Sequence, residues 1–202
     1  MMDNEAFRSV ISLYERNAAA FAKLRATNLS EKPWLDRFLH HVRPNGHILD
    51  LGCGNGTPIA GYLLSRGFRV TGIDSSPSMI ARCKETFPEH TWQVADMREL
   101  QLGHRFDGIL AWDSFFHLTR ADQRQMFAIF SAHASKGAAL MFNAGPADGE
   151  AIGEFQGEPL YHSSLSPLEY ASLLQQYNFH IVHHVVEDQQ CNGRTLWLAA
   201  KD

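Results

Sequence analysis

Cysteines, long apolar runs and targeting signals are scarce or absent in this sequence of 202 residues. Its three cysteines, Cys53, Cys83 and Cys191, are odd in number and lack C-x-x-C spacing, which is typical of reduced thiols in a cytoplasmic protein. No stretch approaches about 18 consecutive apolar residues, so no membrane span is expected. The first residues contain neither a basic segment nor an apolar one, so no secretory signal is expected. We therefore expect a cytoplasmic protein.

Positive charge is also limited. Lys and Arg together number 18 against 22 Asp and Glu, which gives a net charge of −4, and no basic run exceeds two residues. Nucleic-acid-binding proteins usually have a basic surface, because neutralised phosphates supply much of the affinity. We therefore expect a small-molecule partner rather than nucleic acid, and a monomer or homodimer. The 45% apolar and 20% charged residues are typical of an ordinary globular domain.

The most informative motif is Ile48-Leu49-Asp50-Leu51-Gly52-Cys53-Gly54-Asn55-Gly56-Thr57. A short apolar run contains an acid near its end, and glycines then occupy every second position before a segment compatible with a helix. Glycine allows positive φ and lets a ligand approach the backbone closely. The N–H groups of such a turn and helix start lack helical partners, which favours a polar or anionic ligand group.

A second acid, Asp74, follows the apolar run 70–73 and lies 22 residues after Gly52. This spacing suits an acid on the neighbouring strand that binds a ribose diol. The glycine motif departs from G-x-G-x-x-G, because position 57 is Thr, and it lacks the Lys of a P-loop. The sequence therefore predicts a nucleoside-containing cofactor. A nicotinamide oxidoreductase is an alternative that these departures disfavour.

The D-L-G-C-G-N-G-T sequence at 50–57 resembles motif I of the class I S-adenosylmethionine-dependent methyltransferases. Three later segments resemble that family's next strand ends in the same order: 70–77 (V-T-G-I-D-S-S-P), 93–97 (Q-V-A-D-M) and 106–113 (F-D-G-I-L-A-W-D). The resemblance covers about residues 46–145. Positions 111–114 read A-W-D-S rather than the Asn/Asp-Pro-Pro-aromatic tetrad of members that methylate base amines, which favours a small-molecule acceptor.

The resemblance implies that S-adenosyl-L-methionine binds at these strand ends and leaves as S-adenosyl-L-homocysteine. Asp74 would bind both ribose hydroxyls, Met79 would pack on the adenine, and Asp96 would accept a hydrogen bond from the adenine amine. The cofactor-binding residues implied in this way are Asp50, Gly52, Cys53, Gly54, Asn55, Gly56, Asp74, Ser75, Met79, Asp96, Met97 and Trp112.

Hydrophobic periodicity predicts helices at 5–26 and 32–42, followed by strands and helices in alternation. This alternation indicates an α/β fold with a doubly wound, mostly parallel sheet and helices on both faces. The resemblance implies seven strands in the order 3-2-1-4-5-7-6, with the last strand antiparallel. The expected strands are 47–51, 69–73, 91–95, 106–111, 137–142, 179–186 and 195–200, and the later helices are 58–66, 77–85, 121–134 and 167–176.

A single methyltransferase domain is expected over residues 1–202. It would comprise an N-terminal helical lid (1–45), a cofactor-binding core (46–142), a substrate-covering insertion (143–170), and a C-terminal helix end with a strand pair (171–202). The alternative for a connection as long as 144–166 is a disordered excursion.

Tyr14, Phe21 and Arg25 lie on one face of the first predicted helix. We expect this face, together with Asp113, to cover the cofactor and contact the substrate. Arg25 or Arg16 would then meet an acidic group of the cofactor or substrate. The alternative is simple docking of the helix on the sheet.

His117 follows the fourth-strand motif and is the candidate general base, because an imidazole titrates near pH ~6.5. Its alternative role is packing beside the next helix. His180, His183 and His184 lack the spacing of metal ligands, so no metal site is expected.

The sequence thus predicts methyl transfer from S-adenosylmethionine to an O, N or S nucleophile of a small molecule. One alternative is methylation of a protein or a tRNA. Another is a regulatory module that binds the cofactor without transferring methyl, which the presence of Asp50, Asp74 and Asp96 disfavours.

Overall fold

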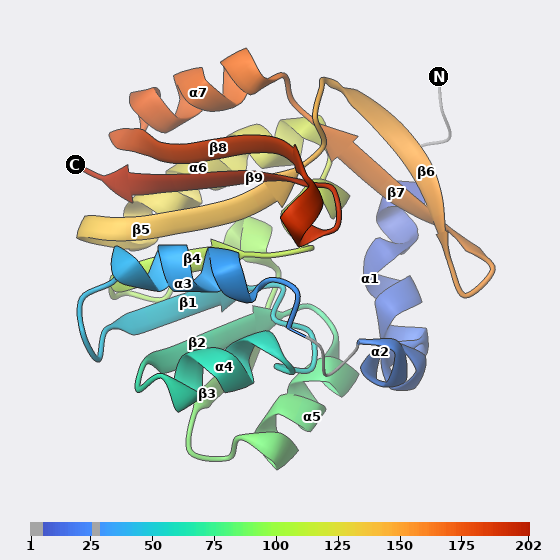
Figure 1. Cartoon of the computed structure of the whole chain (residues 1–202). Helices are drawn as coiled ribbons and strands as arrows, with labels where there is room; N and C mark the ends of the chain where they lie inside the picture. Colours follow the sequence, from blue (N-terminus) through green and yellow to red (C-terminus); the bar gives the residue numbers. More distant parts are fainter. Residues whose placement is uncertain (1–5, 26–28) are drawn as a thin grey trace.

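The computed structural model describes residues 6–25 and 29–202. The ends of the predicted helix 5–26, and residues 1–5 and 26–28 of the predicted lid, lie outside the described residues. A seven-stranded sheet forms the centre of the chain (Figure 1). In spatial order its strands are β3 (Thr91–Val94), β2 (Arg69–Asp74), β1 (His47–Leu51), β4 (Phe106–Ala111), β5 (Ala134–Ala144), β9 (Arg194–Lys201) and β8 (Phe179–Asp188).

The direction of the strands agrees with the prediction. Neighbouring strands from β3 to β5 are parallel, whereas β9 is antiparallel to both β5 and β8. Because β8 and β9 are the sixth and seventh strands of this sheet in chain order, the predicted order 3-2-1-4-5-7-6 and the α/β fold class are confirmed.

Helices cover both faces of the sheet (Figure 1). Aromatic and aliphatic side chains of α3 (Lys32–His40), α4 (Ile59–Ser65) and α5 (Pro77–Thr86) share one buried cluster with one face of the sheet. Side chains of α6 (Arg120–His133) and α7 (Pro167–Gln176) form the second cluster with the opposite face. The central strands are therefore buried on both faces, as their continuous apolar runs predict.

The N-terminal segment contains two helices rather than the single predicted one. They are α1 (Ala6–Arg16) and α2 (Ala18–Leu24), with Asn17 between them outside helical geometry at φ −105° and ψ 15°. Both the backbone N–H and the side-chain amide of Asn17 donate to the carbonyl of Leu13, and that amide also donates to Glu158. Competition between a short polar side chain and the helix backbone explains the break.

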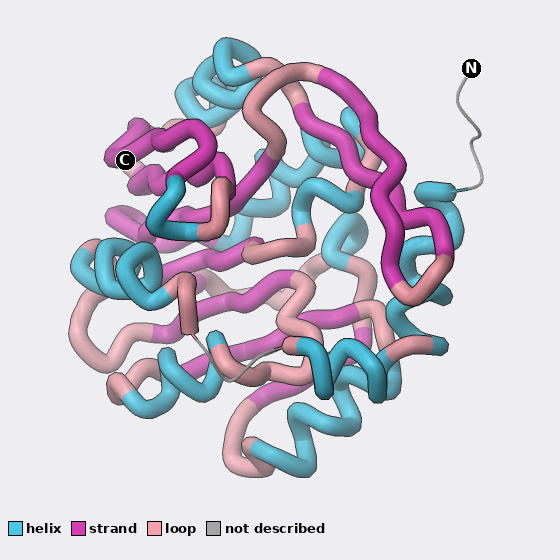
Figure 2. Tube along the Cα trace, turned by 45° about the vertical axis from the view of Figure 1, so that its right-hand side comes forward, coloured by secondary structure: helices cyan, strands magenta, loops and turns pink. Residues whose placement is uncertain are grey.

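The segment between β5 and α7 is an ordered hairpin of β6 (Gly149–Phe155) and β7 (Glu158–Ser164). It extends from the central sheet and runs beside α1 (Figure 2). A third cluster joins the two elements through Val10, Leu13, Leu160 and Tyr161. The insertion predicted at 143–170 thus contains an ordered two-stranded ribbon that packs on α1. Helix α3, which was predicted as part of the lid, packs on the sheet instead.

Strand β5 begins earlier than predicted, at Ala134 directly after α6. Its pairing with β4 is irregular: Phe106 pairs with Ala134, but the next pair is Gly108 with Ala139. Gly137, at φ +76°, lies in the unpaired stretch of β5. Gly137 therefore marks a bulge inside a strand that is longer than predicted.

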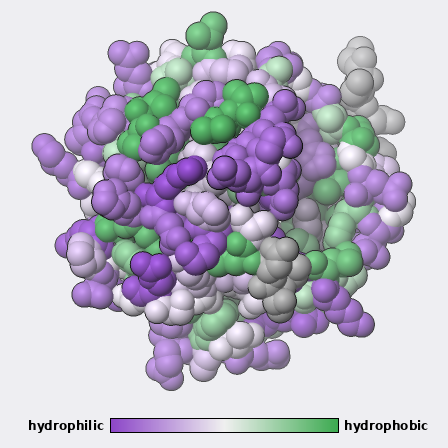
Figure 3. Space-filling view, in the orientation of Figure 1, coloured by the Kyte–Doolittle hydropathy of each residue, from purple (hydrophilic) through white to green (hydrophobic). Residues whose placement is uncertain are grey.

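On the face shown in Figure 3, hydrophobic residues form separate small patches among hydrophilic ones. Within residues 6–25 and 29–202, no helix combines the length and apolarity needed to cross a membrane.

Candidate functional site

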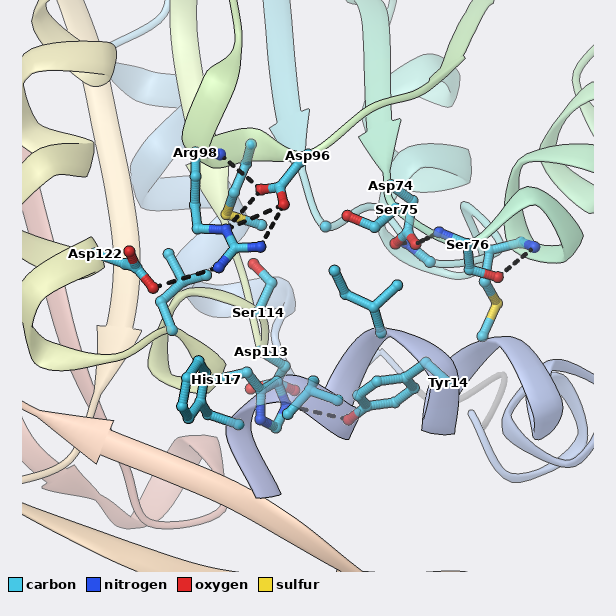
Figure 4. A pocket seen from close by; sticks show the side chains of 18 of the residues that line it. Tyr14, Asp74, Ser75, Ser76, Asp96, Arg98, Asp113, Ser114, His117 and Asp122 are labelled. Atoms are coloured by element: carbon cyan, nitrogen blue, oxygen red, sulfur yellow. Dashed lines mark hydrogen bonds and ion pairs between the residues drawn. The ribbon is translucent and has the colours of Figure 1, made fainter. Parts of the chain in front are cut away.

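A cavity lies at the edge of the sheet where the parallel strands end (Figure 4). Its open space, including the mouth, is about 860 Å³. Helices α1 and α2 supply one wall, and the ends of β1 to β4 supply the other. The predicted site residues that line it are Tyr14, Phe21, Gly52, Gly54, Asp74, Ser75, Met79, Asp96, Met97, Asp113 and His117.

A second, smaller cavity adjoins the first, with Phe21, Gly52, Gly54 and Asp113 lining both. Its open space is about 400 Å³. The remaining predicted residues line it: Arg25, Asp50, Cys53, Asn55, Gly56 and Trp112. The structure therefore brings every residue predicted for the site to one of two connected spaces.

The glycine turn has the conformation that the sequence predicts, with φ of +73° at Gly52, +54° at Gly54 and +76° at Gly56. A Cβ atom at Gly52 would lie 2.3 Å from the Cβ of Ser114, so glycine is required there for space as well as for φ. The N–H groups of the turn differ from expectation, because several bond within the protein. Gly52 and Cys53 donate to the carbonyl of Ile73, and Gly54 donates to the Asp74 carboxylate.

Asp74 ends β2 and is fixed by backbone donors. Gly54 N–H donates to Oδ2 and Ser76 N–H donates to Oδ1, both at 2.9 Å. Each oxygen therefore keeps acceptor capacity for a hydroxyl group in the cavity. Burial raises the pKa of this carboxyl, and the backbone hydrogen bonds oppose that rise.

Asp50 lies on β1 beneath the glycine turn, with only 3% of its surface exposed. Burial, with the charge of Asp74 nearby, raises its pKa to about 7, whereas Arg25 favours the charged form. A ligand cation in the second cavity would therefore favour ionisation of Asp50.

His117 is held by two hydrogen bonds on opposite sides of its ring. Nδ1 lies 2.9 Å from the carbonyl oxygen of Tyr161, and Nε2 lies 3.1 Å from the hydroxyl of Tyr14. Because a carbonyl only accepts, Nδ1 carries the proton and Nε2 accepts from Tyr14. Burial lowers the pKa of His117 to about 4, so the imidazole is neutral near pH 7 and is a weaker base than the sequence alone predicts.

Asp113 follows β4 in a left-handed conformation, at φ +48°. Its carboxylate accepts a two-pronged ion pair from Arg194 on β9, at 2.9 and 2.7 Å, and a further bond from Asn143 on β5 at 2.6 Å. Burial alone would raise the pKa of Asp113, but these donors outweigh it and hold the pKa below its usual value. The strand ends behind the cavity are thereby tied together.

Helix α1 is anchored to the opposite wall by Glu15, a residue that the sequence analysis missed. Its carboxylate accepts hydrogen bonds from the hydroxyls of Ser76 and Ser78 and from the N–H of Ser78, at the start of α5. A second anchor joins Arg16 to Glu158 on β7 at 2.5 Å. Arg16 therefore faces the hairpin, and Arg25 is the arginine of the two that lines a cavity.

Arg98, Thr119 and Asp122, which the sequence did not predict, also line the first cavity, near Asp96. Arg98 forms an ion pair with Asp96 (Figure 4). The signal in the sequence was the position of Arg98 two residues after Asp96, the acid that follows β3. Among the described residues, no group of three His, Cys, Asp or Glu side chains is arranged to hold a metal ion.

Comparison with known proteins places this site in context. Residues 48–137 match the family model described as "Methyltransferase domain". The putative methyltransferase 235L of Invertebrate iridescent virus 6 is 36% identical over 92 residues, which cover 45% of this chain and 32% of that protein. A trans-aconitate 2-methyltransferase of Escherichia coli O1:K1 / APEC is 43% identical over 68 residues, which cover 32% of this chain and 26% of the relative.

The likeness to solved structures extends over the whole fold. The 1,6-didemethyltoxoflavin-N1-methyltransferase of Burkholderia thailandensis, solved with 1,6-didemethyltoxoflavin and S-adenosylhomocysteine bound, superposes with a TM-score of 0.73 at 19% identity. The match covers 98% of this chain and 88% of that one. The fold that the motifs imply is therefore confirmed, and the match to the methyltransferase domain model covers residues 48–137 of the chain.

Proposed function

Residues 48–137 carry a methyltransferase domain, and from this premise we propose that the chain transfers a methyl group from S-adenosylmethionine to a small molecule. The matched segments span only about a third or less of the first curated relatives, so the proposal depends on this chain's own site. The observation that supports it best is the convergence of the glycine turn with Asp74 and Asp96 on a single covered cavity.

The nucleoside half of the cofactor fits the first cavity. Asp74 offers acceptor oxygens suited to two ribose hydroxyls, and the turn at Gly52 has no room for a side chain. Met79 is buried to 1% exposure and presents an apolar surface to the same space, as adenine packing requires. Asp96 lies beyond it as an acceptor for the adenine amine.

The amino-acid half fits the second cavity. Asp50 there would accept from the ammonium group, and Arg25 would donate to the carboxylate. Arg25 also pairs with the buried Glu31, which holds its guanidinium in place. Cys53, Asn55, Gly56 and Trp112 complete the wall.

When bound, the cofactor supplies an electrophilic methyl group and its own leaving group. The residues of this chain therefore need mainly to align the acceptor and exclude water, and orientation alone supplies about 7–11 kcal/mol of barrier reduction. Asp113 lines both cavities, and Tyr14, on α1, lines the first.

We assign proton removal to the pair of His117 and Tyr14. The neutral Nε2 of His117 faces the Tyr14 hydroxyl. As an acceptor loses its proton to the Tyr14 oxygen, the Tyr14 proton passes to Nε2. The imidazole then carries the proton on Nε2, and the Tyr161 carbonyl holds its other ring nitrogen.

A small acceptor is favoured over a protein or a tRNA because helices α1 and α2 form one wall of the cavity, and the hairpin packs on α1. The relatives named above are consistent with this choice: one is named for trans-aconitate and another for a toxoflavin precursor. A binding module without transfer is the second candidate, since burial keeps the pKa of His117 low for a general base.

The first test is thermal melting with S-adenosylmethionine, S-adenosylhomocysteine and NAD, each at about a hundredfold its Kd. Binding at that ratio stabilises by about 2.7 kcal/mol, which is roughly 5–10 °C for a chain of this size. We expect a shift with the two sulfur nucleosides and none with NAD. Asp74→Asn should remove the shift, and the exposed Asp148→Asn should retain it. A shift with NAD alone would refute the proposal, and a screen for label transfer then separates enzyme from module.

A further inference from the structure

Arg98 folds back onto Asp96 from the short turn η1 (Met97–Glu99) (Figure 4). The Arg98 backbone N–H donates to Oδ1 of Asp96 at 2.9 Å. Its Nε lies 2.9 Å from Oδ1 and 3.0 Å from Oδ2, and Nη2 lies 2.5 Å from Oδ2. One residue thus fixes both oxygens of the acid.

Arg98 is itself held from behind. Its Nη1 lies 3.4 Å from Oδ2 of Asp122, in the first turn of α6. Asp122 is fixed in turn by Thr119, whose hydroxyl lies 2.9 Å from the same carboxylate oxygen and accepts from the Asp122 N–H at 3.1 Å. The guanidinium is therefore clamped between the end of β3 and the start of α6, and Arg98, Thr119 and Asp122 all line the cavity.

This arrangement decides what Asp96 can bind. A carboxylate has about four lone-pair directions, and three N–H groups of Arg98 share them. About one direction is left for a single further donor. Hydrogen bonds from Arg98 outweigh the effect of burial and lower the pKa of Asp96, so the acid stays ionised and has no proton to donate. Such a group accepts from an amine and repels a carbonyl oxygen.

We propose that Arg98 is a positioning residue that presents Asp96 as a one-donor acceptor, so that the site selects a 6-amino purine over a 6-oxo purine. This inference rests on the proposed function, because it concerns the purine end of the cofactor. Arg98 acts through Asp96 and does not itself read the base.

The test compares binding of two ligands by calorimetry: S-adenosylhomocysteine, and S-inosylhomocysteine, in which oxygen replaces the 6-amino group. We expect the wild type to prefer the amino compound by at least about tenfold. Arg98→Met should reduce this preference to within about threefold, mainly by weakening the amino compound. Arg98→Lys keeps the charge but loses the planar guanidinium that donates to both oxygens of Asp96. It should give an intermediate ratio of the two affinities.

Arg124→Met is the matched control, because Arg124 forms an ion pair with Glu169 at the surface of α6 and lies outside both cavities. Its ratio should equal that of the wild type. If Arg98→Met weakens both ligands equally, Arg98 has a general structural role or contacts the ligand directly, and the inference is wrong although the proposed function stands. If the wild type binds neither compound, the proposed function fails and the inference with it. Arg98→Lys keeps the test available if Arg98→Met does not fold.

Discussion

The hydroxyl of Tyr14 lies 3.1 Å from Nε2 of His117, although 103 residues separate them in the chain. The contact joins the covering helix α1 to the turn that follows β4. Helix α1 therefore does more than form a wall of the cavity, because its Tyr14 completes the hydrogen bonding of His117, the candidate base. Burial raises the pKa of Tyr14, with Asp113 and Asp74 adding to the rise, so the phenol remains protonated and donates to His117.

Replacing Tyr14 by Phe should slow methyl transfer far more than it weakens cofactor binding. With an acceptor from the label-transfer screen, we expect kcat to fall by about a hundredfold, the usual scale for proton-transfer catalysis. The affinity for S-adenosylhomocysteine should stay within about threefold. Tyr62→Phe removes a phenol that bonds Asp36 at the surface, and it should leave kcat unchanged. An unaltered kcat in Tyr14→Phe would refute the assigned proton route.

The buried His117 should make the protein sensitive to acid. Its pKa is about 4 in the folded state, against about 6.5 when unfolded, so between these values the unfolded chain binds the extra proton. Stability is therefore fully present above pH ~6.5 and is lost as pH falls towards 4. Between pH 7.5 and 4.5 the loss from this group is about 2–3 kcal/mol.

The measurement is urea unfolding of the wild type and of His117→Gln at both pH values. Other groups titrate in both proteins. The difference between the two proteins in how their free energy of unfolding changes with pH therefore reports the contribution of His117. We expect the wild type to lose about 2–3 kcal/mol more than the variant. Parallel losses in the two proteins would show that the imidazole charges as readily in the folded state as in the unfolded one.

Glu15→Gln should loosen the cover without unfolding the sheet. The charged acceptor that holds Ser76 and Ser78 is lost, and hydrogen bonds to a charged group are roughly twice as strong as neutral ones. Amide exchange over α1 and α2 should accelerate while that of β1 and β4 does not. S-adenosylhomocysteine should bind up to about tenfold more weakly. Glu85→Gln, on the exposed surface of α5, is the control. Equal exchange in both variants would mean that other contacts hold the cover.

Alanine substitutions at two glycines should distinguish the cost of steric crowding from the cost of backbone strain. Gly52 and Gly103 have similar φ, +73° and +70°, but an added Cβ at Gly52 meets Ser114 at 2.3 Å, whereas at Gly103 it meets nothing within 4 Å. Gly103→Ala should therefore cost about 1–2 kcal/mol for the left-handed conformation. Gly52→Ala should cost at least about 1–3 kcal/mol more and abolish cofactor binding. Equal free energies of unfolding for the two variants would contradict the crowding at Gly52.

The elements that the sequence predicted well are those with local signals. Strands β1, β2 and β4 follow from apolar runs, and their order follows from the resemblance carried by Asp50, Asp74 and Asp96. The candidate site was predictable for the same reason, because parallel strands bring their carboxyl ends to one edge. Whether each residue contacts a ligand stays a prediction.

The features that the sequence did not predict depend on partners far away in the chain. The break at Asn17 involves a bond to Glu158, and the function of Glu15 depends on Ser76 and Ser78. The low pKa of His117 depends on how the hairpin and α1 bury it, which periodicity cannot show. The pairing of Arg98 with Asp96 is the local exception: it requires the chain to turn back over two residues, which periodicity does not indicate.

The pairing of α1 with the hairpin also bears on the order in which the chain is built. Helix α1 is synthesised long before β7, yet Arg16 finds its partner Glu158 only 142 residues later. Contacts so distant in sequence require closure of a long loop, which is slow compared with local folding. On the ribosome, α1 therefore has no β7 to pack against until most of the sheet has been made. The cavity therefore gains its α1 wall, packed on β7, only late in synthesis, although α1 itself is made early.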